Sequence, residues 1–358
     1  MNSVQREPRR VAVVGAGIAG LSCARILQAS GLAVSLFDKG RAPGGRVSTR
    51  RVGANGFDLG AQYFTASHPA FLREVESLVA AGHCAPWSGR IASIHDGAIE
   101  TTTPVPRWVG VPGMSQLPRG LAQDLTVFPG HRVDRLLRGS GALQLQGARA
   151  EAGATLGPTP ERPDARAQEV FGDFDAVLVC VPAPQAVTLL SDVSVELASV
   201  VSAVAFDPCF AVAILAAGPA LLDLSFDAAF VGRAPHQGSP LAWIACESSK
   251  PGRSPGGRWV LHASPAWSRA HLAAEPSWVG AELLAAFRAL PGLAGVAAEV
   301  CVVHRWLLAR PATGQGLAEP VFDPGLRVGA AGDWCGAGNI EAAYMAGAAL
   351  AERVLATP

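Results

Sequence analysis

Three glycines near the start of the sequence have the spacing of a phosphate-binding turn. Gly15, Gly17 and Gly20 follow a short apolar run at 11–14 and open a stretch of helical character. In such a turn the first glycine permits a tight bend. The second lets the backbone approach a pyrophosphate, and the third lets the helix pack on the strand. Asp38 ends the next apolar strand 18 residues after Gly20, close to the offset of about 20 for an acid that binds a ribose hydroxyl. These residues predict a dinucleotide site; an ordinary strand–helix–strand unit with a tight turn is the alternative.

The elements that must hold this turn can be predicted from apolar spacing. Residues 11–14 and 34–37 are apolar runs short enough for buried parallel strands. We expect further helices at 68–81, 115–125, 278–290 and 340–355, and a strand followed by a turn at 209–222. The last helix has a predicted buried stripe and a predicted N-cap, Asn339. Residues 147–166 are rich in Ala, Gly and Pro and predict a surface loop or hairpin insertion with no assigned role.

Composition excludes several classes of function. The 358 residues carry a net charge of +0 with only 16% charged residues, so nothing favours a nucleic-acid partner. The seven cysteines lack C-x-x-C or zinc spacing, which predicts reduced thiols in a cytoplasm and no metal site. Arg9-Arg10 before an apolar run is similar to a twin-arginine signal, but the strand, turn and helix already account for that run. We expect no membrane span and two domains.

Two later motifs make a family resemblance specific. Residues 43–49 read PGGRVST, and residues 57–65 read FDLGAQYFT. Together with the glycine turn and its acid, the first motif resembles the flavin-containing amine oxidase superfamily. FDLGAQYFT, SSKPGR at 248–253 and WVLHAS at 259–264 resemble the renalase-like branch of that superfamily. The resemblance implies one FAD, held without a covalent bond, in place of a free NAD.

The resemblance also implies which residues contact the FAD. The implied contacts come from the glycine turn and second strand, the GGR loop, the 60–62 backbone, one adenine-side valine and the start of the last helix. The set is Gly15, Ala16, Gly17, Ile18, Ala19, Gly20, Asp38, Lys39, Gly45, Arg46, Gly60, Ala61, Gln62, Val133, Gly332, Asp333, Asn339 and Ile340. Arg46 as a surface side chain and Asp333 as a turn or N-cap residue are the alternatives.

The implied fold is α/β, a Rossmann-type FAD-binding domain with a second α+β substrate domain on a mixed or antiparallel sheet. We expect a discontinuous FAD-binding domain at 8–62, 105–185 and 318–358. The substrate domain is expected at 63–104 and 186–317. Aromatic residues are the candidates for the substrate side, with a place in the core as the alternative: Tyr63, Phe64, Trp108, Trp243 and Trp306.

The expected activity is that of an FAD-dependent oxidase. Many amine oxidases keep a lysine near flavin N5 and an aromatic residue before the last helix. This sequence has only Lys39 and Lys250 as lysines and Asn339 before that helix. The renalase-like branch instead implies hydride transfer from a misreduced dihydronicotinamide to flavin N5, with O2 reduced to H2O2. Its partners are then a small substrate and O2, and the catalytic side chains stay open. Alternatives are an amine oxidase, a desaturase or a flavin-holding redox sensor.

Overall fold

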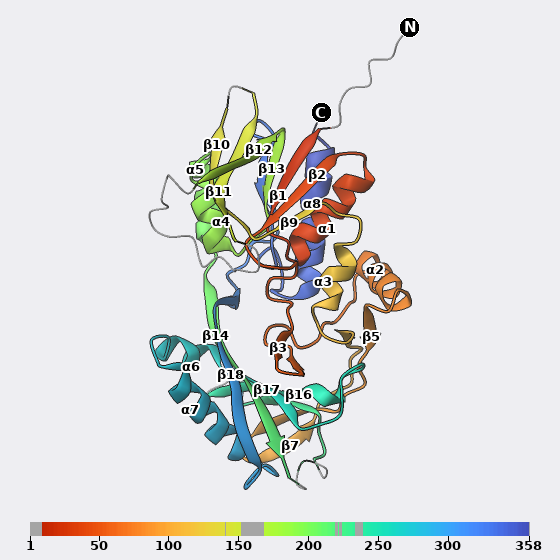
Figure 1. The fold of residues 1–358 in the computed structure, drawn as a ribbon, viewed down its shortest axis with the longest axis vertical. Coiled ribbons are helices and arrows are strands. Elements are labelled where there is room, and N and C mark those ends of the chain that lie inside the picture. The colour runs from red at the N-terminus through yellow and green to blue at the C-terminus, as the bar shows by residue number, and fades with distance from the viewer. Residues whose placement is uncertain are drawn as a thin grey trace. The chain divides into compact units, whose positions relative to one another are not determined.

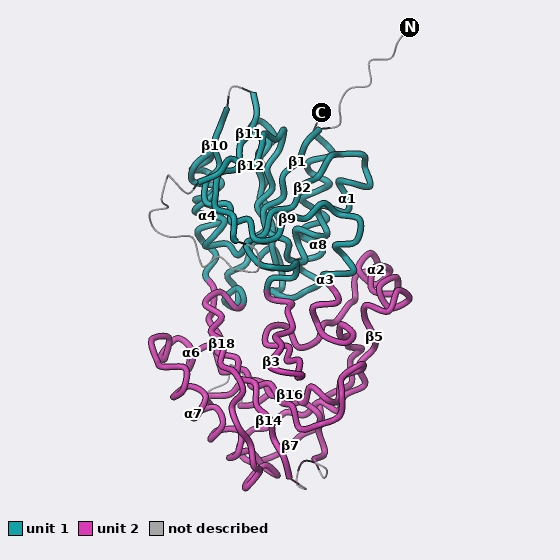
Figure 2. Tube along the Cα trace, viewed as in Figure 1, with its two compact units in different colours: residues 1–45, 118–205, 310–358 teal, residues 46–117, 206–309 magenta. Residues whose placement is uncertain are grey.

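The computed structural model describes residues 9–139, 141–151, 168–218, 221, 224–232 and 239–357. The chain forms two compact units, each built from separate stretches of sequence (Figure 2). Unit 1 comprises residues 1–45, 118–205 and 310–358, and unit 2 comprises residues 46–117 and 206–309. The domain boundaries expected from the sequence follow cofactor contacts and stay a prediction.

Unit 1 is organised on a six-stranded sheet of order β19-β20-β13-β1-β2-β9 (Figure 1). All neighbours are parallel except β19 and β20. The strands are β1 (Arg10–Val14), β2 (Ala33–Asp38), β9 (Val127–Pro129), β13 (Ala176–Val179), β19 (Val321–Asp323) and β20 (Val328–Ala330). Both predicted N-terminal strands are confirmed. Residues 11–14 are all buried, as expected for an inner strand paired on both sides.

Helices α1 (Ile18–Ala29) and α8 (Ile340–Leu355) pack against each other in unit 1. Ser22 Oγ donates a 2.8 Å hydrogen bond to the carbonyl of Tyr344. A Cβ at Gly347 would lie 2.0 Å from the carbonyl oxygen of Ala19, so only glycine permits this approach. The predicted last helix is confirmed, and its predicted stripe is buried.

The rest of unit 1 consists of a second, smaller sheet and several helices. A separate three-stranded antiparallel sheet has the order β10-β11-β12. The remaining elements are β10 (His131–Arg138), β11 (Leu143–Arg149), β12 (Glu169–Phe174), α4 (Ala183–Leu190) and α5 (Val195–Ser202). Helix α3 (Gln116–Leu121) crosses the unit boundary and ends earlier than the predicted 115–125. Of the predicted insertion, 147–149 belong to β11, and 152–166 lie outside the described residues.

Unit 2 contains a seven-stranded mixed sheet of order β18-β14-β17-β16-β15-β6-β7. Strands β15 and β6 pair in parallel, while β14, β17, β16 and β15 form an antiparallel series. The strands are β6 (Ile91–His95), β7 (Ala98–Thr101), β14 (Phe206–Ala217), β15 (Ala228–Val231), β16 (Leu241–Cys246), β17 (Arg258–Ala263) and β18 (Ala297–Pro311). The mixed sheet of the second domain is therefore confirmed.

Helices and hairpins complete unit 2. Helix α7 places Val279, Leu283 and Phe287, four residues apart, in the core beside the sheet. The other elements are α2 (Pro69–Ala80), α6 (Pro265–Ala270), α7 (Pro276–Arg288), the 3₁₀ turn η3 (Glu247–Ser249), and the pairs β3 (Arg50–Val52) with β4 (Asn55–Phe57) and β5 (Cys84–Pro86) with β8 (Trp108–Gly110). The predicted helices at 68–81 and 278–290 are confirmed within two residues.

Candidate functional site

The glycine turn of unit 1 has two positions where a side chain is excluded and one where space is left. Gly15 has φ +104°, and a Cβ there would lie 2.4 Å from the carbonyl oxygen of Cys180. At Gly20 a Cβ would meet the Gly15 carbonyl oxygen at 1.9 Å. At Gly17 a Cβ would meet nothing within 4 Å. The first and third glycines are therefore needed by the fold, and the second leaves open space beside the backbone.

That open space lies at an uncapped helix N-terminus. Gly17 is the N-cap of α1 and offers no side-chain acceptor to the first helical N–H groups. Free N–H groups and the helix dipole favour an anion such as a pyrophosphate at this position. The residues present therefore fit the phosphates of a dinucleotide.

Asp38 ends β2 next to this turn. Its carboxylate accepts 2.7 Å hydrogen bonds from the backbone N–H groups of Ala16 and Gly40. Burial raises the pKa of Asp38, and these two N–H donors act against that rise. Burial likewise lowers the pKa of the neighbouring Lys39 ammonium. The acid is thus fixed against the glycine turn, where a carboxylate can accept from a ribose hydroxyl.

The C-terminal part of the chain reaches the same edge of the sheet. Because β20, β13 and β1 are parallel neighbours, their carboxyl ends meet there. The N–H of Cys180 donates to Val14, and Trp334 Nε1 donates to Val181 at 3.0 Å. Asp333, which precedes Trp334, is 7% exposed. Ligands bind at this edge in open α/β sheets, so both ends of the sequence contribute to one candidate site.

Three further predicted contacts of unit 1 have a clear structural setting. Asn339 Oδ1 accepts a 2.8 Å hydrogen bond from Ala342 N–H, which confirms the predicted N-cap of α8. Val133 is buried on β10 at an irregularity of register between Val133 and Arg135. Gly45 has φ +54°, and a Cβ added there would meet no atom within 4 Å. The roles of these residues toward FAD stay predictions.

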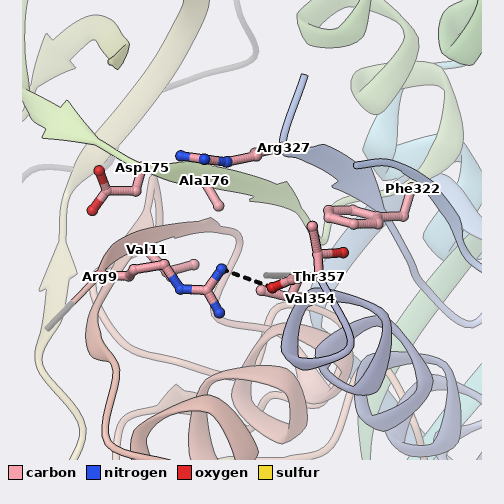
Figure 3. A pocket seen from close by; sticks show the side chains of 8 residues that line it. All are labelled: Arg9, Val11, Asp175, Ala176, Phe322, Arg327, Val354 and Thr357. Carbon is pink, nitrogen blue, oxygen red and sulfur yellow. Dashed lines mark hydrogen bonds between the residues drawn. The ribbon is translucent and has the colours of Figure 1, made fainter. Parts of the chain in front are cut away.

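A cavity at the opposite edge of the unit 1 sheet is not a candidate. It lies by the amino ends of β1 and β13, where Arg9 Nη1 donates to the carbonyl of Thr357 at 3.0 Å (Figure 3). Its enclosed volume of about 10 Å³ holds at most one water molecule. Its lining residues are Arg9, Val11, Asp175, Ala176, Phe322, Arg327, Val354 and Thr357.

In unit 2 the motif at 57–65 is held tightly by its backbone. A Cβ at Gly60 would lie 1.9 Å from the carbonyl oxygen of Arg46, which accepts a 3.0 Å hydrogen bond from Ala61 N–H. Arg46 Nη1 donates to the carbonyl of Ala309 at 3.1 Å, and its guanidinium lies 5.5 Å from the ring centroid of Phe206. Glycine is therefore required at 60 because two backbone segments touch there.

The carbonyl of Leu59 anchors the same motif to two strands of the sheet. Trp306 Nε1 on β18 donates to it at 2.9 Å, and His262 Nε2 on β17 lies 3.1 Å from it. His262 therefore carries its proton on Nε2, facing that carbonyl. Burial lowers the pKa of His262 to about 4, so the ring is neutral at pH 7. Trp306, a predicted substrate-side residue, here holds the backbone of the motif.

Four buried charged side chains, one of them from this motif, form a cluster that the sequence did not predict. We name Asp58, Glu247, Lys250 and Arg253 the buried charge cluster. Lys250 Nζ lies 2.5 Å from Glu247 Oε1 and 3.5 Å from Asp58 Oδ2, and it donates to Gln62 Oε1 at 3.1 Å. Arg253 Nη2 lies 2.5 Å from Asp58 Oδ2. The lysine is thus committed to carboxylates and to Gln62.

The two carboxylates of this cluster titrate differently. Burial opposes ionisation of Asp58, but Lys250 and Arg253 overcome it and lower the pKa of that carboxyl. Burial and the negative charge of Asp58 raise the pKa of Glu247 to about 7. The cluster therefore holds two cations, one firm anion and one carboxyl that exchanges its proton near neutral pH.

Three aromatic rings lie together beside this cluster, and we name Tyr63, Trp87 and Trp243 the aromatic layer. The Tyr63 ring centroid is 5.5 Å from that of Trp243 and 6.0 Å from that of Trp87. The guanidinium of Arg107 lies 5.2 Å from the Tyr63 ring, and Lys250 Nζ lies 5.9 Å from the Trp87 ring. Cations over ring faces are attractive. The structure thus places two predicted aromatic residues, Tyr63 and Trp243, beside Trp87 and Arg107, which no motif indicated.

The other predicted aromatics have different surroundings. Phe64 pairs with Trp108 through backbone hydrogen bonds, and their rings stack at 6.2 Å. Phe64 also packs against Phe71 of α2 and is 3% exposed, which places it in the core. Among the described residues, no group of His, Cys, Asp and Glu side chains is arranged to hold a metal ion. In the same residues, no helix combines the length and the apolar character required to cross a bilayer.

Comparison with known proteins gives matches over the whole chain. The model of the NAD(P)-binding Rossmann-like domain matches residues 13–78, and that of the flavin containing amine oxidoreductases matches residues 92–355. A redesigned putrescine oxidase is similar in structure, with a TM-score of 0.68 and 13% identity over 98% of this chain and 99% of that one. A structure assigned as a protoporphyrinogen oxidase from Exiguobacterium sp. 255-15 has a TM-score of 0.69 and 14% identity over 99% of each chain.

A curated relative matches only a short segment of the chain. Hydroxyneurosporene desaturase from Rubrivivax gelatinosus is 50% identical over 56 residues, which is 16% of this chain and 11% of that protein. The structural likenesses, at low identity, show the fold, whereas the family model covers well over half of the chain. The cradle of unit 1, with its uncapped helix and open Gly17, fits the dinucleotide that such proteins carry. The chain belongs to the flavin containing amine oxidoreductase family and is an FAD-dependent oxidoreductase.

Proposed function

We propose that this oxidoreductase is an oxidase of misreduced dihydronicotinamides, the 2- or 6-dihydro isomers of NAD(P)H. The substrate loses a hydride and becomes NAD(P)⁺. O2 takes up that hydride with one proton and leaves as H2O2. When bound, FAD supplies the acceptor for the hydride and the route for two electrons to O2. The observation that carries the proposal is the aromatic layer with Arg107 beside it, because planar rings and a cation suit an aromatic, anionic substrate.

The state of Lys250 supports this choice over amine oxidation. A protonated amine must lose a proton before it can give up a hydride, so an amine oxidase benefits from a base near the reacting carbon. Lys250 is buried against Glu247 and Gln62 and lacks the freedom to act as that base. Asn339 caps α8 and builds no aromatic cage. A dihydronicotinamide isomer is already a hydride donor, so the protein has only to bind and orient it.

The chain's own residues then have distinct tasks. In unit 1, the uncapped start of α1 and the carboxylate of Asp38 are proposed to hold the pyrophosphate and ribose of FAD. The remaining FAD contacts expected from the sequence, including those at 60–62, are part of the same proposal. In unit 2, the buried charge cluster keeps Gln62 in place through Lys250. FAD is proposed to be held without a covalent bond, in a cytoplasmic protein.

The test is anaerobic reduction of the bound flavin. Stopped-flow absorbance near 450 nm should show rapid bleaching with 2- or 6-dihydro-NAD(P) and no bleaching with simple primary amines or polyamines. Admission of air should restore the absorbance with one H2O2 formed per substrate. Bleaching by amines without bleaching by the dihydro isomers would contradict the proposal.

A second candidate is oxidation of an amine or desaturation of an apolar substrate. The family model and the local match to hydroxyneurosporene desaturase favour it. The same stopped-flow screen separates the two, since putrescine or an apolar polyene would then be the substrate that bleaches the flavin.

A further inference from the structure

Arg107 and Trp243 stand out because each presents a buried donor without an acceptor. Within the part of the chain that the structure describes, Arg107 Nε and Trp243 Nε1 are buried from solvent and have no hydrogen-bond partner. Trp243 as a whole is only 6% exposed. Buried donors are almost always paired, and leaving one unpaired opposes folding. Both donors therefore call for an acceptor that is absent from the polypeptide.

Both side chains lie beside the same ring of unit 2, that of Tyr63. The guanidinium of Arg107 lies 5.2 Å from the Tyr63 ring, and the Trp243 ring lies 5.5 Å from it. Trp243 also contacts Phe230 at 4.7 Å, edge to face, which fixes the orientation of its indole. The backbone carbonyl of Arg107 accepts from Trp87 N–H at 2.8 Å, so the arginine is tied to the aromatic layer through its main chain as well.

The charge balance here favours an anion. Lys250, the cation on the Trp87 side of the layer, is neutralised by Glu247 and Asp58. Arg107 forms no ion pair with a carboxylate anywhere in the described residues; its Nη1 donates a hydrogen bond to the carbonyl of Val105 at 3.2 Å. An uncompensated guanidinium next to aromatic rings attracts a phosphate and repels an ammonium ion.

We propose that Arg107 and Trp243 form an anion anchor, which binds the phosphate of an aromatic nucleotide whose ring lies on the aromatic layer. The donors of Arg107 meet the phosphate oxygens, and Trp243 Nε1 supplies a further hydrogen bond to the ligand. The anchor makes Arg107 a specificity-determining residue that selects nucleotides and excludes cationic amines. The identity of the ring as a nicotinamide rests on the proposed function, whereas the anchor itself does not.

Binding of two unreactive probes tests the anchor. Nicotinamide mononucleotide and nicotinamide riboside differ only by the phosphate, and their dissociation constants can be measured on the FAD-loaded protein by the change in flavin absorbance. The wild-type protein should bind the mononucleotide more tightly. Arg107→Met should weaken mononucleotide binding by about ten- to a hundredfold, the effect of one lost charged hydrogen bond. It should not weaken binding of the riboside, which has no phosphate and carries a positive charge on its pyridinium ring.

Two variants complete the design. Arg73→Met is the matched control, since Arg73 is an exposed arginine of the same unit on α2. It should leave both constants unchanged. Trp243→Phe keeps a ring and removes the N–H donor of the anchor, so it should weaken mononucleotide binding several-fold and change riboside binding little. Flavin content and circular dichroism establish that each variant is folded.

The outcomes separate this proposal from the proposed function. Equal affinity for the two probes, or equal behaviour of Arg107→Met and Arg73→Met, would overturn the anchor even if dihydronicotinamides are oxidised. Selective loss of mononucleotide binding in Arg107→Met would support the anchor even if the dihydro isomers fail to bleach the flavin.

Discussion

Replacement of Lys250 by methionine tests the physical account of unit 2. Methionine keeps the length of the side chain and removes the charge. Glu247 then loses its partner at 2.5 Å and keeps Arg253 Nε at 4.0 Å and the backbone N–H of Asp58 at 3.4 Å. The side chains of Lys250 and Glu247 are at most 1% exposed, so water cannot replace the lost partner. Removal of one member of a buried ion pair costs about 3–5 kcal/mol. We expect a loss of that size at pH 8.

The loss should depend on pH in a defined direction. The pKa of Glu247 is about 7 in the folded protein, and Lys250 is one of the charges that hold it down. Without Lys250 that pKa rises further, so the folded variant keeps its proton across pH 6–8 while the wild type releases it. A folded state that binds more protons loses stability more steeply as pH rises. Integrated from pH 6 to pH 8, the extra loss is about 1.4 kcal/mol.

Urea unfolding of the FAD-loaded protein at pH 6 and pH 8 measures both quantities. Seven of the eight tryptophans lie in unit 2, so their fluorescence reports the unfolding of that unit. The double variant Lys250→Met with Glu247→Gln should recover part of the stability. It also lacks the carboxyl that titrates in this range, so its loss relative to the wild type should be smaller at pH 8 than at pH 6. Arg90→Met, which removes an ion pair to Asp227 whose arginine side chain is 58% exposed, should cost under about 1 kcal/mol. A loss below about 1 kcal/mol for Lys250→Met, or no pH difference, would refute the reasoning.

Three further predictions concern the two units separately. Gly17→Ala should leave the melting temperature of the apoprotein unchanged yet abolish FAD retention on a desalting column, whereas Gly15→Ala should destabilise the apoprotein itself because its Cβ meets Cys180; equal melting losses would contradict the distinction. His262 is neutral with a pKa of about 4 and favours folding above its unfolded pKa of about 6.5. The free energy of unfolding relative to His262→Gln should therefore fall by about 2–3 kcal/mol between pH 7 and pH 4. The same pH dependence of urea unfolding in the two proteins would refute this. Burial raises the pKa of Cys335 to about 12, which makes it a poor nucleophile, so acid precipitation should release the flavin into the supernatant, and colour in the pellet would contradict this.

The sequence predicts the glycine turn of unit 1 and the acid beside it because their signals are local. Gly15, Gly20 and Asp38 act on backbone within a few residues or on the neighbouring strand, and their spacing encodes that geometry. The N-cap at Asn339 is equally local. Helix and strand positions follow from apolar periodicity for the same reason. The roles of these residues toward FAD stay predictions.

The buried charge cluster could not be predicted because its partners are far apart in sequence. Asp58 and Lys250 are separated by 192 positions, and each alone is compatible with a surface residue. Arg107 and Trp87 lie in stretches without a motif, and only the fold brings them to Tyr63. One signal was present in the sequence. Because the 358 residues include only two lysines, a lysine inside a family motif indicates a contact with an acidic side chain.

The discontinuous layout of unit 1 has a consequence for biosynthesis. Residues up to 309 contain every segment of unit 2, whereas β20 and α8 of unit 1 are synthesised after them. Until then α1 lacks the helix that covers it, and β13 lacks its parallel neighbour β20. Pairing of segments so remote in sequence is slow and leaves apolar surface uncovered in the meantime. We expect the nucleotide cradle to be completed only after the whole of unit 2 has been synthesised.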